Sequence, residues 1–320
     1  MPATTRRRAL AVALAAAALG VSGCSGAGGS DGPAETEVPT FGDLPAEIDY
    51  VALGDSYSAG PLVTTVRSDP SGCVRSTDNY PAFLAGWLAV GSYRDVTCSG
   101  ADTSDLRRRQ QVIGGESVAP QLEALSEETD LVTLGIGGND FGIFSSLVGC
   151  APGDARACSP GLQQRLLRDA GRVEARVERA VRQVSERAPE AEVYVVGYPR
   201  VLPTEDGCSA VPLPESQLET AASVAQRLND SLRAGAESAG ASYVDLDEAS
   251  EGHDVCAGRD AWINGPEMRL GVAAPFHPLL AGMRGVAEEV FGTITGDDAP
   301  EAETAAPPTD AVVRNEVPAG

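Results

Sequence analysis

Residues 48–60 read IDYVALGDSYSAG. The first six form a mostly apolar run, which ends at Gly-Asp-Ser, residues 54–56. Three other runs end as abruptly: at Ser-Gly after residue 98, at Gly-Gly-Asn-Asp after residue 136 and at Gly-Tyr-Pro after residue 196. The strong runs are continuous rather than alternating, which is typical of parallel strands covered on both faces. We predict five strands, at residues 48–53, 93–98, 130–136, 192–196 and 242–246.

Segments with helical periodicity separate these strands. After residue 160, leucine and valine recur mostly at spacings of three, four or seven, so they share one helix face. They are Leu162, Leu166, Val173, Val177, Val181 and Val184. Residues 214–239 and 279–292 have similar character. The alternation predicts a doubly wound α/β sandwich, in which ligands bind at the carboxyl ends of the strands.

The composition limits the possible partners and the number of domains. The chain has 320 residues, with 24 arginines, no lysine and 46 acidic residues, for a formal net charge of −22. Such a chain repels phosphate backbones, so we expect no nucleic-acid partner. Separately, we expect a monomer. We predict a signal at 1–23, a flexible tether at 24–40, one domain at 41–295 and an acidic, Pro-rich disordered tail at 296–320.

The first residues have the pattern of an export signal. Arginines at positions 6–8 precede an apolar run at 9–21, and small residues lead to Cys24. Residues 21–24, Val-Ser-Gly-Cys, resemble a bacterial lipobox, in which Cys24 is lipidated and becomes the mature N-terminus. Plain cleavage is the alternative. We expect the protein on the outer face of the cytoplasmic membrane, held only through a lipid anchor at Cys24, or secreted.

The cysteines agree with export. There are seven, and six remain if Cys24 carries lipid, an even number suited to disulfides in an oxidising compartment. Six cysteines allow 15 pairings, among which the sequence does not choose. The chain has no CxxC motif and two histidines, so we expect no metal site and no cofactor.

A serine and a histidine are the candidate catalytic pair. Ser56 follows a predicted buried strand, where a helix N-terminus would favour negative charge at its Oγ, although a capping serine in a turn fits the same pattern. Of the two histidines, His277 precedes Pro278, which suits the first position of the last helix. His253 lies three residues before a cysteine, and we expect it to be held in that loop. We therefore prefer His277 as the base.

Two further segments could stabilise an oxyanion. Asn139 follows two glycines after the third strand, so its amide is a fixed donor that a substrate can approach closely. An ordinary Gly-Asn turn is the alternative. Gly100 follows the second strand, and its N–H could donate as well.

These four blocks, in this order, resemble the GDSL or SGNH hydrolase family, across about residues 48–294. Ser56, Gly100, Asn139 and His277 match the four residues that name it. The resemblance implies a flavodoxin-like three-layer sandwich with a five-stranded parallel sheet. It implies that Ser56 is the nucleophile and His277 the base, and that the N–H groups of Ser56 and Gly100 and the Asn139 side chain form an oxyanion hole.

Within that family, the six cysteines and residues 252–256 resemble secreted actinomycete lipases and esterases. That resemblance implies that sequential disulfides staple the domain. They would be Cys73–Cys98, Cys150–Cys158 and Cys208–Cys256.

The sequence departs from the family pattern three residues before His277. Most of the family has an aspartate there, whereas this chain has Ala274, with no acidic residue between Glu267 and Glu288. We predict a Ser–His dyad in which the Ala274 carbonyl accepts the Nδ1–H of His277, since Pro275 biases Ala274 toward an extended conformation. The actinomycete subgroup implies a carbonyl in this role too.

The leading hypothesis is a serine-dependent carboxylic ester hydrolase acting on acyl esters, as an esterase or lipase, possibly a phospholipase. A carbohydrate O-deacetylase of the same family is one alternative, and a non-enzymatic surface lipoprotein that binds glycan or lipid is another. We expect residues 61–76 to line the pocket. Phe141, Phe144 and Leu147 fit a pocket wall or a helix core equally well.

Overall fold

The computed structural model describes residues 44–150, 159–306 and 312–313. Its main sheet is parallel throughout, with the order β7-β6-β5-β1-β2-β8. The strands are β1 (Asp49–Gly54), β2 (Ser92–Asp95), β5 (Leu131–Gly135), β6 (Glu192–Val196), β7 (Ser242–Val244) and β8 (Val312–Val313). A separate antiparallel hairpin joins β3 (Gln110–Gln111) to β4 (Ser117–Val118).

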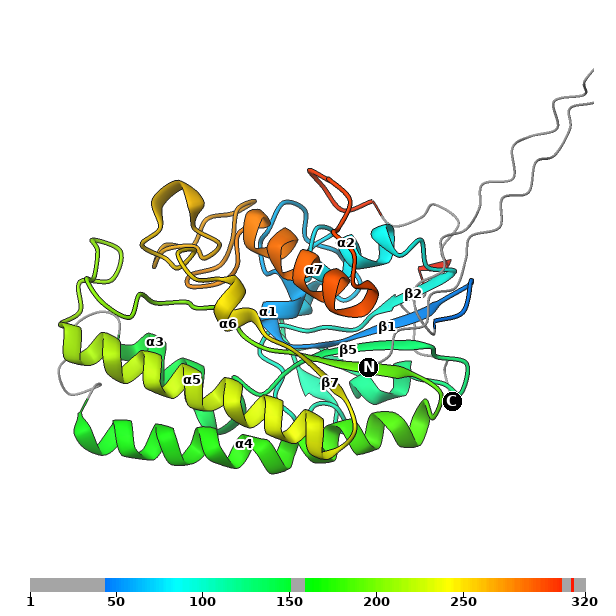
Figure 1. The fold of residues 1–320 in the computed structure, drawn as a ribbon, viewed down its shortest axis with the longest axis horizontal. Coiled ribbons are helices and arrows are strands. Elements are labelled where there is room, and N and C mark those ends of the chain that lie inside the picture. The colour runs from blue at the N-terminus through cyan, green and yellow to red at the C-terminus, as the bar shows by residue number, and fades with distance from the viewer. Residues whose placement is uncertain (1–43, 151–158, 307–311, 314–320) are drawn as a thin grey trace, which may run out of the picture. The chain divides into compact units, whose positions relative to one another are not determined.

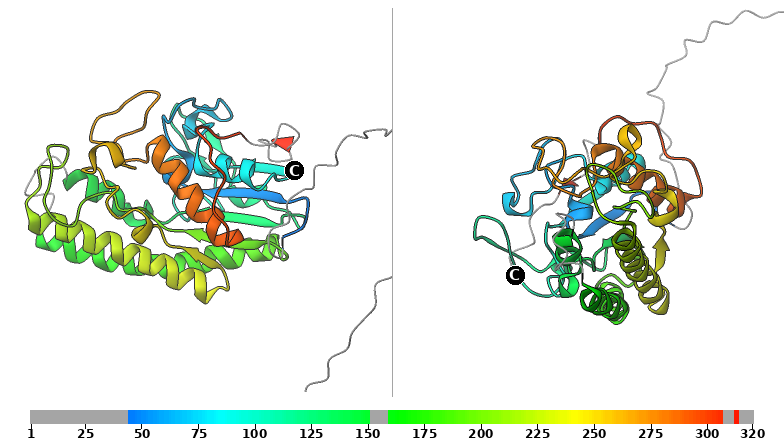
Figure 2. Two further views of the ribbon diagram at one scale, coloured as in Figure 1. Left: turned by 45° about the horizontal axis from the view of Figure 1, so that its top comes forward. Right: turned by 90° about the vertical axis from the view of Figure 1, so that its left-hand side faces the viewer.

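Helices cover both faces of the sheet (Figure 1). The long helices α4 and α5 lie side by side on one face, and α2 and α7 pack together on the other (Figure 2). The helices are α1 (Ser56–Ala59), α2 (Tyr80–Trp87), α3 (Ile143–Cys150), α4 (Pro160–Arg187), α5 (Glu215–Ser238), α6 (Leu246–Ala249) and α7 (Leu280–Thr295). Short 3₁₀ turns are η1 (Ser71–Cys73), η2 (Gln121–Ala124), η3 (Asp140–Gly142) and η4 (Gly258–Asp260).

The side chains of strand β1 explain why helices pack on both faces of the sheet. Val51 and Leu53 belong to the apolar core beneath α4 and α5, whereas Tyr50 and Ala52 belong to the core beneath α2 and α7. All four side chains are at most 5% exposed. Because successive side chains of a strand point to opposite faces, an uninterrupted apolar run requires a layer of helices on each side.

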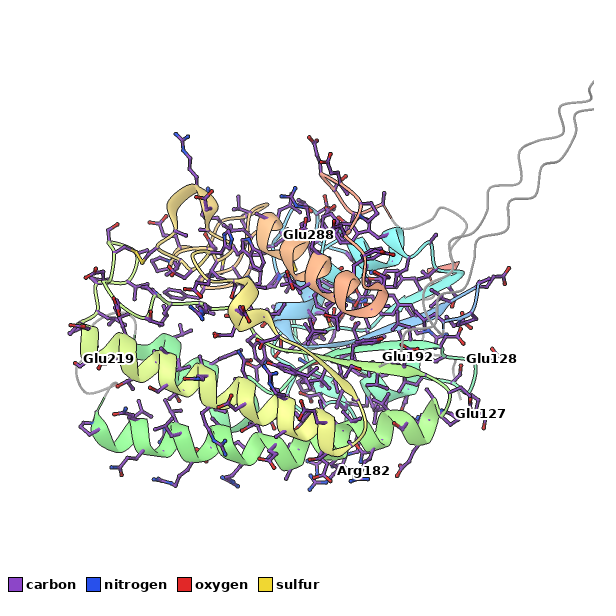
Figure 3. The ribbon with its side chains drawn as sticks, in the orientation of Figure 1. Glu127, Glu128, Arg182, Glu192, Glu219 and Glu288 are labelled. Carbon is purple, nitrogen blue, oxygen red and sulfur yellow. A yellow bond between two sulfur atoms is a disulfide. The ribbon has the colours of Figure 1, made fainter. Side chains whose placement is uncertain are left out.

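Charged side chains lie on the outer faces of the helices. Arg182 of α4, Glu219 of α5 and Glu288 of α7 are exposed (Figure 3). Arg182 pairs with Glu178 one turn earlier, at 2.8 Å. Such exposed pairs contribute little to stability and leave the inner faces to the core.

The predicted α/β sandwich with five parallel strands is confirmed. β8 adds a two-residue strand beside β2, and the second strand ends at Asp95 rather than at residue 98. The predicted helices correspond to α4, α5 and α7. Across the described residues, no helix combines the length and apolarity that a membrane span requires.

Two of the three disulfides that the resemblance implied are present, Cys73–Cys98 and Cys208–Cys256. The bond between Cys150 and Cys158, the signal with Cys24 and the tether lie outside the described residues. After α7, Ala299, Ala302 and Ala305 pack against the core beneath α2 and α7. The limits of the tether, domain and tail stay predictions.

Candidate active site

The four singled-out residues meet at the carboxyl ends of three neighbouring strands. Ser56 follows β1, Gly100 follows β2, Asn139 follows β5, and His277 comes shortly before α7. All four line one cavity of about 680 Å³. The order β5-β1-β2 therefore brings together residues that lie up to 221 positions apart.

The turn after β1 presents Ser56. Asp55 caps α1 by accepting the backbone N–H of Tyr57 at 2.9 Å, and Gly60 ends the helix in the left-handed conformation. The chain passes very close to β5 here, since a Cβ on Gly54 would lie 2.7 Å from the carbonyl oxygen of Gly135. Glycine at position 54 is therefore required for the serine to stand where it does.

His277 lies directly against the serine. Its Nε2 is 2.9 Å from Oγ of Ser56, and its Nδ1 is 2.7 Å from the carbonyl oxygen of Pro275. A carbonyl can only accept, so Nδ1 carries the hydrogen and the lone pair of Nε2 faces the serine hydroxyl. The Tyr57 ring lies 5.1 Å from the imidazole, and its hydroxyl donates to the carbonyl of Phe276 at 2.7 Å.

The predicted role of Ala274 was wrong by one residue. Its carbonyl oxygen accepts the backbone N–H of His277 at 3.3 Å and the side-chain amide of Asn264 at 3.0 Å, whereas Nδ1 of His277 meets the carbonyl of Pro275. Phe276 has φ +57°, which turns the chain tightly and aims the Pro275 carbonyl at Nδ1 instead. Position 276 holds a bulky residue in the left-handed region, which the sequence gives no reason to expect.

Asn264 holds this turn, a role that the sequence analysis missed. Its Nδ2 lies within 2.8–3.1 Å of three carbonyl oxygens, those of Glu267, Ala273 and Ala274. Its backbone N–H donates to the carbonyl of His277 at 2.9 Å. An asparagine 13 residues before the histidine is not a signal that a sequence pattern identifies.

The surroundings of His277 keep it neutral. Burial lowers its pKa below the ordinary 6.5, and the hydrogen bond to Pro275 opposes part of that shift. A base with a low pKa is deprotonated at neutral pH and is ready to accept the serine proton.

His253 lies elsewhere, in the loop closed by Cys208–Cys256. Its Nδ1 is 2.6 Å from the carbonyl oxygen of Asp260, and its ring stacks on Trp262 with 4.9 Å between centroids. The described residues that line the cavity include His277 and not His253.

The candidate oxyanion donors border the same cavity. Gly100 has φ +81°, a conformation that favours glycine. Across the described residues, no acceptor meets the backbone N–H of Ser56 or of Gly100. One hydrogen of the Asn139 amide is used by the carbonyl of Ala101 at 2.9 Å, which fixes the side chain and leaves the second hydrogen available.

The buried carboxylate of Asp140 ties the loop of Gly100 to the segment of Asn139 and pairs with a half-buried arginine, contacts that the sequence analysis missed as well. The carboxylate of Asp140 accepts the backbone N–H and the hydroxyl of Thr103, at 3.0 and 2.6 Å, and it pairs with Arg176 of α4 at 2.6 Å. Asp140 stood within the quoted Gly-Gly-Asn-Asp motif, but Arg176 is 36 residues away on a helix face. Only the fold brings them together.

The cavity has a largely apolar wall and an apolar rim. Phe144 and Leu147 of α3 line it, as do alanines of α5, whereas Phe141 packs under the guanidinium of Arg176. Pro61, Leu62 and Val74 line it from the segment after Gly60, in line with the expected position of residues 61–76. At the mouth, Ile113 and Met268 are 73% and 67% exposed, and Leu270 follows on the same loop at 79%.

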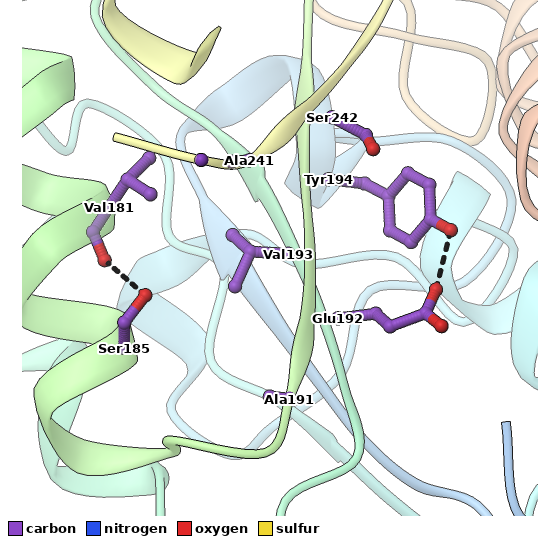
Figure 4. A pocket seen from close by; sticks show the side chains of 9 residues that line it. Val181, Ser185, Ala191, Glu192, Val193, Tyr194, Ala241 and Ser242 are labelled. Atoms are coloured by element: carbon purple, nitrogen blue, oxygen red, sulfur yellow. Dashed lines mark hydrogen bonds between the residues drawn. The ribbon is translucent and has the colours of Figure 1, made fainter. Parts of the chain in front are cut away.

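A second cavity, of about 270 Å³, lies at the far end of β6 and β7 (Figure 4). Two of its three hydroxyls are already hydrogen-bonded: Ser185 donates to the carbonyl of Val181 at 3.2 Å, and Tyr194 donates to Glu192 at 2.7 Å. Nothing that lines it combines a nucleophile with a base.

Comparisons with known proteins agree with this geometry. Residues 52–284 match the model of the GDSL-like lipase/acylhydrolase family. Lipase 2 of Streptomyces coelicolor is 37% identical over 92% of this chain and 99% of that protein. The crystal structure of the extracellular lipase of Streptomyces rimosus superposes with a TM-score of 0.66, at 29% identity, over 78% of this chain and 100% of that one. Phospholipase A1 of Streptomyces albidoflavus gives a TM-score of 0.65 at 32% identity, over 77% and 98% of the two chains.

Proposed function

The chain belongs to the GDSL-like lipase/acylhydrolase family and is a carboxylic ester hydrolase, and we propose that Ser56 and His277 perform its chemistry as a dyad. The observation that carries this proposal is the 2.9 Å contact between Oγ of Ser56 and Nε2 of His277 at the cavity wall. The imidazole is oriented by a main-chain carbonyl.

The reaction proceeds in two halves. His277 takes the proton of Ser56 as Oγ attacks the ester carbonyl carbon, and a tetrahedral intermediate forms. The C–O bond to the alcohol then breaks, the alcohol leaves with the proton held on Nε2, and the acyl group remains on Ser56. Water then attacks the acyl carbon as His277 takes its proton, the bond between the acyl carbon and Oγ of Ser56 breaks, Oγ regains the proton from Nε2, and the carboxylic acid leaves. The hydrogen bond from Nδ1 to Pro275 keeps the imidazole in the tautomer that both halves need.

Three donors would stabilise the negative charge of the intermediate. The N–H groups of Ser56 and Gly100 and the second amide hydrogen of Asn139 border the space beside Oγ. They are fixed before substrate binds, since Asn139 is held by Ala101 and the Gly100 loop by Asp140. Donors that need no rearrangement contribute most to this kind of catalysis.

Lipid esters are the substrate class that the cavity supports best. Phe144, Leu147 and small α5 side chains form a wall with few charges, which suits an acyl chain better than a sugar. Ile113 and Met268 line the cavity and expose apolar surface, to which Leu270, two residues after Met268, adds, and such surface favours contact with aggregated lipid.

The place of action is part of the proposal. A lipid on Cys24 would hold the enzyme outside the cytoplasmic membrane as a monomer, with the tether between anchor and domain. Mass spectrometry of the mature N-terminus tests this, because acylation adds the mass of fatty chains. An unmodified N-terminus and release into the medium would instead identify a secreted enzyme.

The test of function uses p-nitrophenyl esters from acetate to palmitate, with wild type, Ser56→Ala and, as a matched control, Ser223→Ala on the exposed face of α5. We expect Ser56→Ala to lose about 10³-fold or more in kcat and the control to lose nothing. Long chains should be preferred over acetate. Preference for acetate would contradict the lipid assignment, and equal rates for wild type and Ser56→Ala would contradict the nucleophile.

A further inference from the structure

Tyr198 is a buried tyrosine just after β6 to which the reaction assigns no step. Its hydroxyl lies 2.6 Å from Oδ2 of Asp55 and 2.8 Å from the backbone nitrogen of Gly138. Asp55 immediately precedes the nucleophile Ser56, and Gly138 immediately precedes Asn139. One hydroxyl therefore joins the side chain of the residue beside the nucleophile to the backbone beside an oxyanion donor.

The directions of these two hydrogen bonds are fixed. A backbone N–H can only donate, so the oxygen of Tyr198 accepts from Gly138 and gives its own hydrogen to Asp55. The other carboxyl oxygen accepts from Tyr57, at 2.9 Å. Burial raises the pKa of Asp55 to about 7, and both hydrogen bonds oppose that rise. Asp55 is 0% and Tyr198 4% exposed, so bulk water has little access to replace a lost partner.

The tyrosine is itself held firmly. The side chain of Asn229 binds both sides of its backbone, accepting its N–H at 3.0 Å and donating to its carbonyl at 2.9 Å. The ring meets Tyr57 and Phe144 edge-on, with centroids 5.2 and 4.7 Å apart. Tyr57 in turn packs on His277, so the ring of Tyr198 also supports the base from behind.

We propose that Tyr198 is a positioning residue whose hydroxyl keeps Asn139 in register with Ser56. This inference rests on the proposed function, because it assumes that Asn139 donates to the intermediate. Tyr198 lines the cavity, but the two partners of its hydroxyl, Asp55 and Gly138, are not among the lining residues. Loss of the hydroxyl should therefore slow turnover without weakening substrate binding.

The primary test compares Tyr198→Phe with Tyr50→Phe on the best p-nitrophenyl ester. Tyr50 is a matched control, since its hydroxyl is also fully buried and bonded, to Oγ1 of Thr133 at 2.7 Å, on the opposite face of the sheet. We expect Tyr198→Phe to lower kcat about 10- to 100-fold, less than the loss of a whole oxyanion donor, with KM within about twofold. Tyr50→Phe should keep kcat within about twofold.

A double-mutant cycle with Asn139→Ala shows through which group the tyrosine acts. In the Asn139→Ala background, Tyr198→Phe should cost less than about threefold, because the amide that it positions is gone. Asn229→Ala, which loosens Tyr198 without removing its hydroxyl, should behave similarly with a smaller loss.

Each of the following results would overturn the inference while leaving the proposed function intact. One is an unchanged kcat for Tyr198→Phe, and another is an equal loss in both backgrounds. Equal losses for Tyr198→Phe and Tyr50→Phe would indicate general destabilisation and would also overturn it. A wild type that neither hydrolyses esters nor reacts with a fluorophosphonate would overturn the proposed function, and the inference with it.

Discussion

His277 and His253, the two histidines of the chain, have closely similar surroundings. In each, Nδ1 meets a main-chain carbonyl oxygen, at 2.7 Å and 2.6 Å. Each ring packs on an aromatic neighbour, at 5.1 Å and 4.9 Å between centroids. They differ at Nε2, which in His277 faces a serine hydroxyl at a cavity wall.

The comparison separates orientation from reactivity. A carbonyl and an aromatic ring are enough to fix an imidazole and its tautomer, and the loop of Cys208–Cys256 uses them at the protein surface. Chemistry requires in addition a nucleophile in reach, and His277 has one, since its Nε2 lies 2.9 Å from Oγ of Ser56, while burial lowers its pKa.

The largest effect should come from removing each histidine in turn. His277→Ala should lower kcat/KM by about 10³-fold or more, since the serine loses its base, whereas His253→Ala should stay within about twofold. Steady-state kinetics on a p-nitrophenyl ester measure both. A comparable loss in the two variants would mean that geometry around Nδ1 matters more than contact with Ser56.

The next effect should come from the disulfide that closes the loop of His253. Replacing Cys208 and Cys256 together by serine opens a link between positions 48 residues apart. We expect the free energy of unfolding to fall by about 2–4 kcal/mol, with kcat at 25 °C within about threefold. Urea unfolding measures the first and ester kinetics the second. A large loss of kcat at a temperature where the variant is folded would show that this loop also holds the active site.

A smaller effect on catalysis should come from Asn264, which holds the turn before His277. Asn264→Ala removes the amide that binds three carbonyl oxygens in the turn before the histidine. We expect kcat to fall about tenfold as the imidazole loses its fixed aim at Ser56. Tyr50→Phe, which alters a buried, hydrogen-bonded side chain on the opposite face of the sheet, is the comparison and should keep kcat within about twofold. Unchanged kcat in Asn264→Ala would show that Pro275 orients the base unaided.

The smallest effect is a shift in pH dependence. Because burial lowers the pKa of His277, kcat/KM should stay high at neutral pH and decline only below about pH 6.5. At His277 the native state then binds fewer protons than the unfolded state, so this residue's contribution to stability should decline as pH falls through that range, whereas Asp55, whose pKa burial raises to about 7, contributes in the opposite direction. The decline in rate should persist in Asp55→Asn, which removes the neighbouring carboxyl with a pKa of about 7. A decline of kcat/KM that begins above pH 6.5 would contradict the assignment of His277, with its lowered pKa, as the base.

Much of the site could be predicted because of where the strands end. Ser56, Gly100 and Asn139 each follow a predicted strand, and parallel strands end at one edge, so their meeting follows from the fold class. His277 was identified because the chain offers two histidines and one of them precedes a helix. These are local signals, and they are strong where glycine interrupts an apolar run.

Other features of the site could not be predicted, because they depend on contacts between distant segments or on an unusual backbone conformation. The shift from Ala274 to Pro275 depends on the left-handed conformation of Phe276, which no sequence rule favours. The pairing of Asp140 with Arg176 and the bridge from Tyr198 to Asp55 join segments 36 and 143 residues apart. Such contacts depend on side-chain directions within the finished fold.

The orienting group of His277 has a genetic consequence because it belongs to the main chain. Every amino acid that could replace Pro275 has the same carbonyl, so no single codon change can delete this hydrogen-bond acceptor. An aspartate in the same role could be lost in one mutational step. A mutation can change the position of this carbonyl only indirectly, by altering the turn that Phe276 and Asn264 hold. Substitutions that disturb the orientation of His277 should therefore occur at those two codons more than at codon 275.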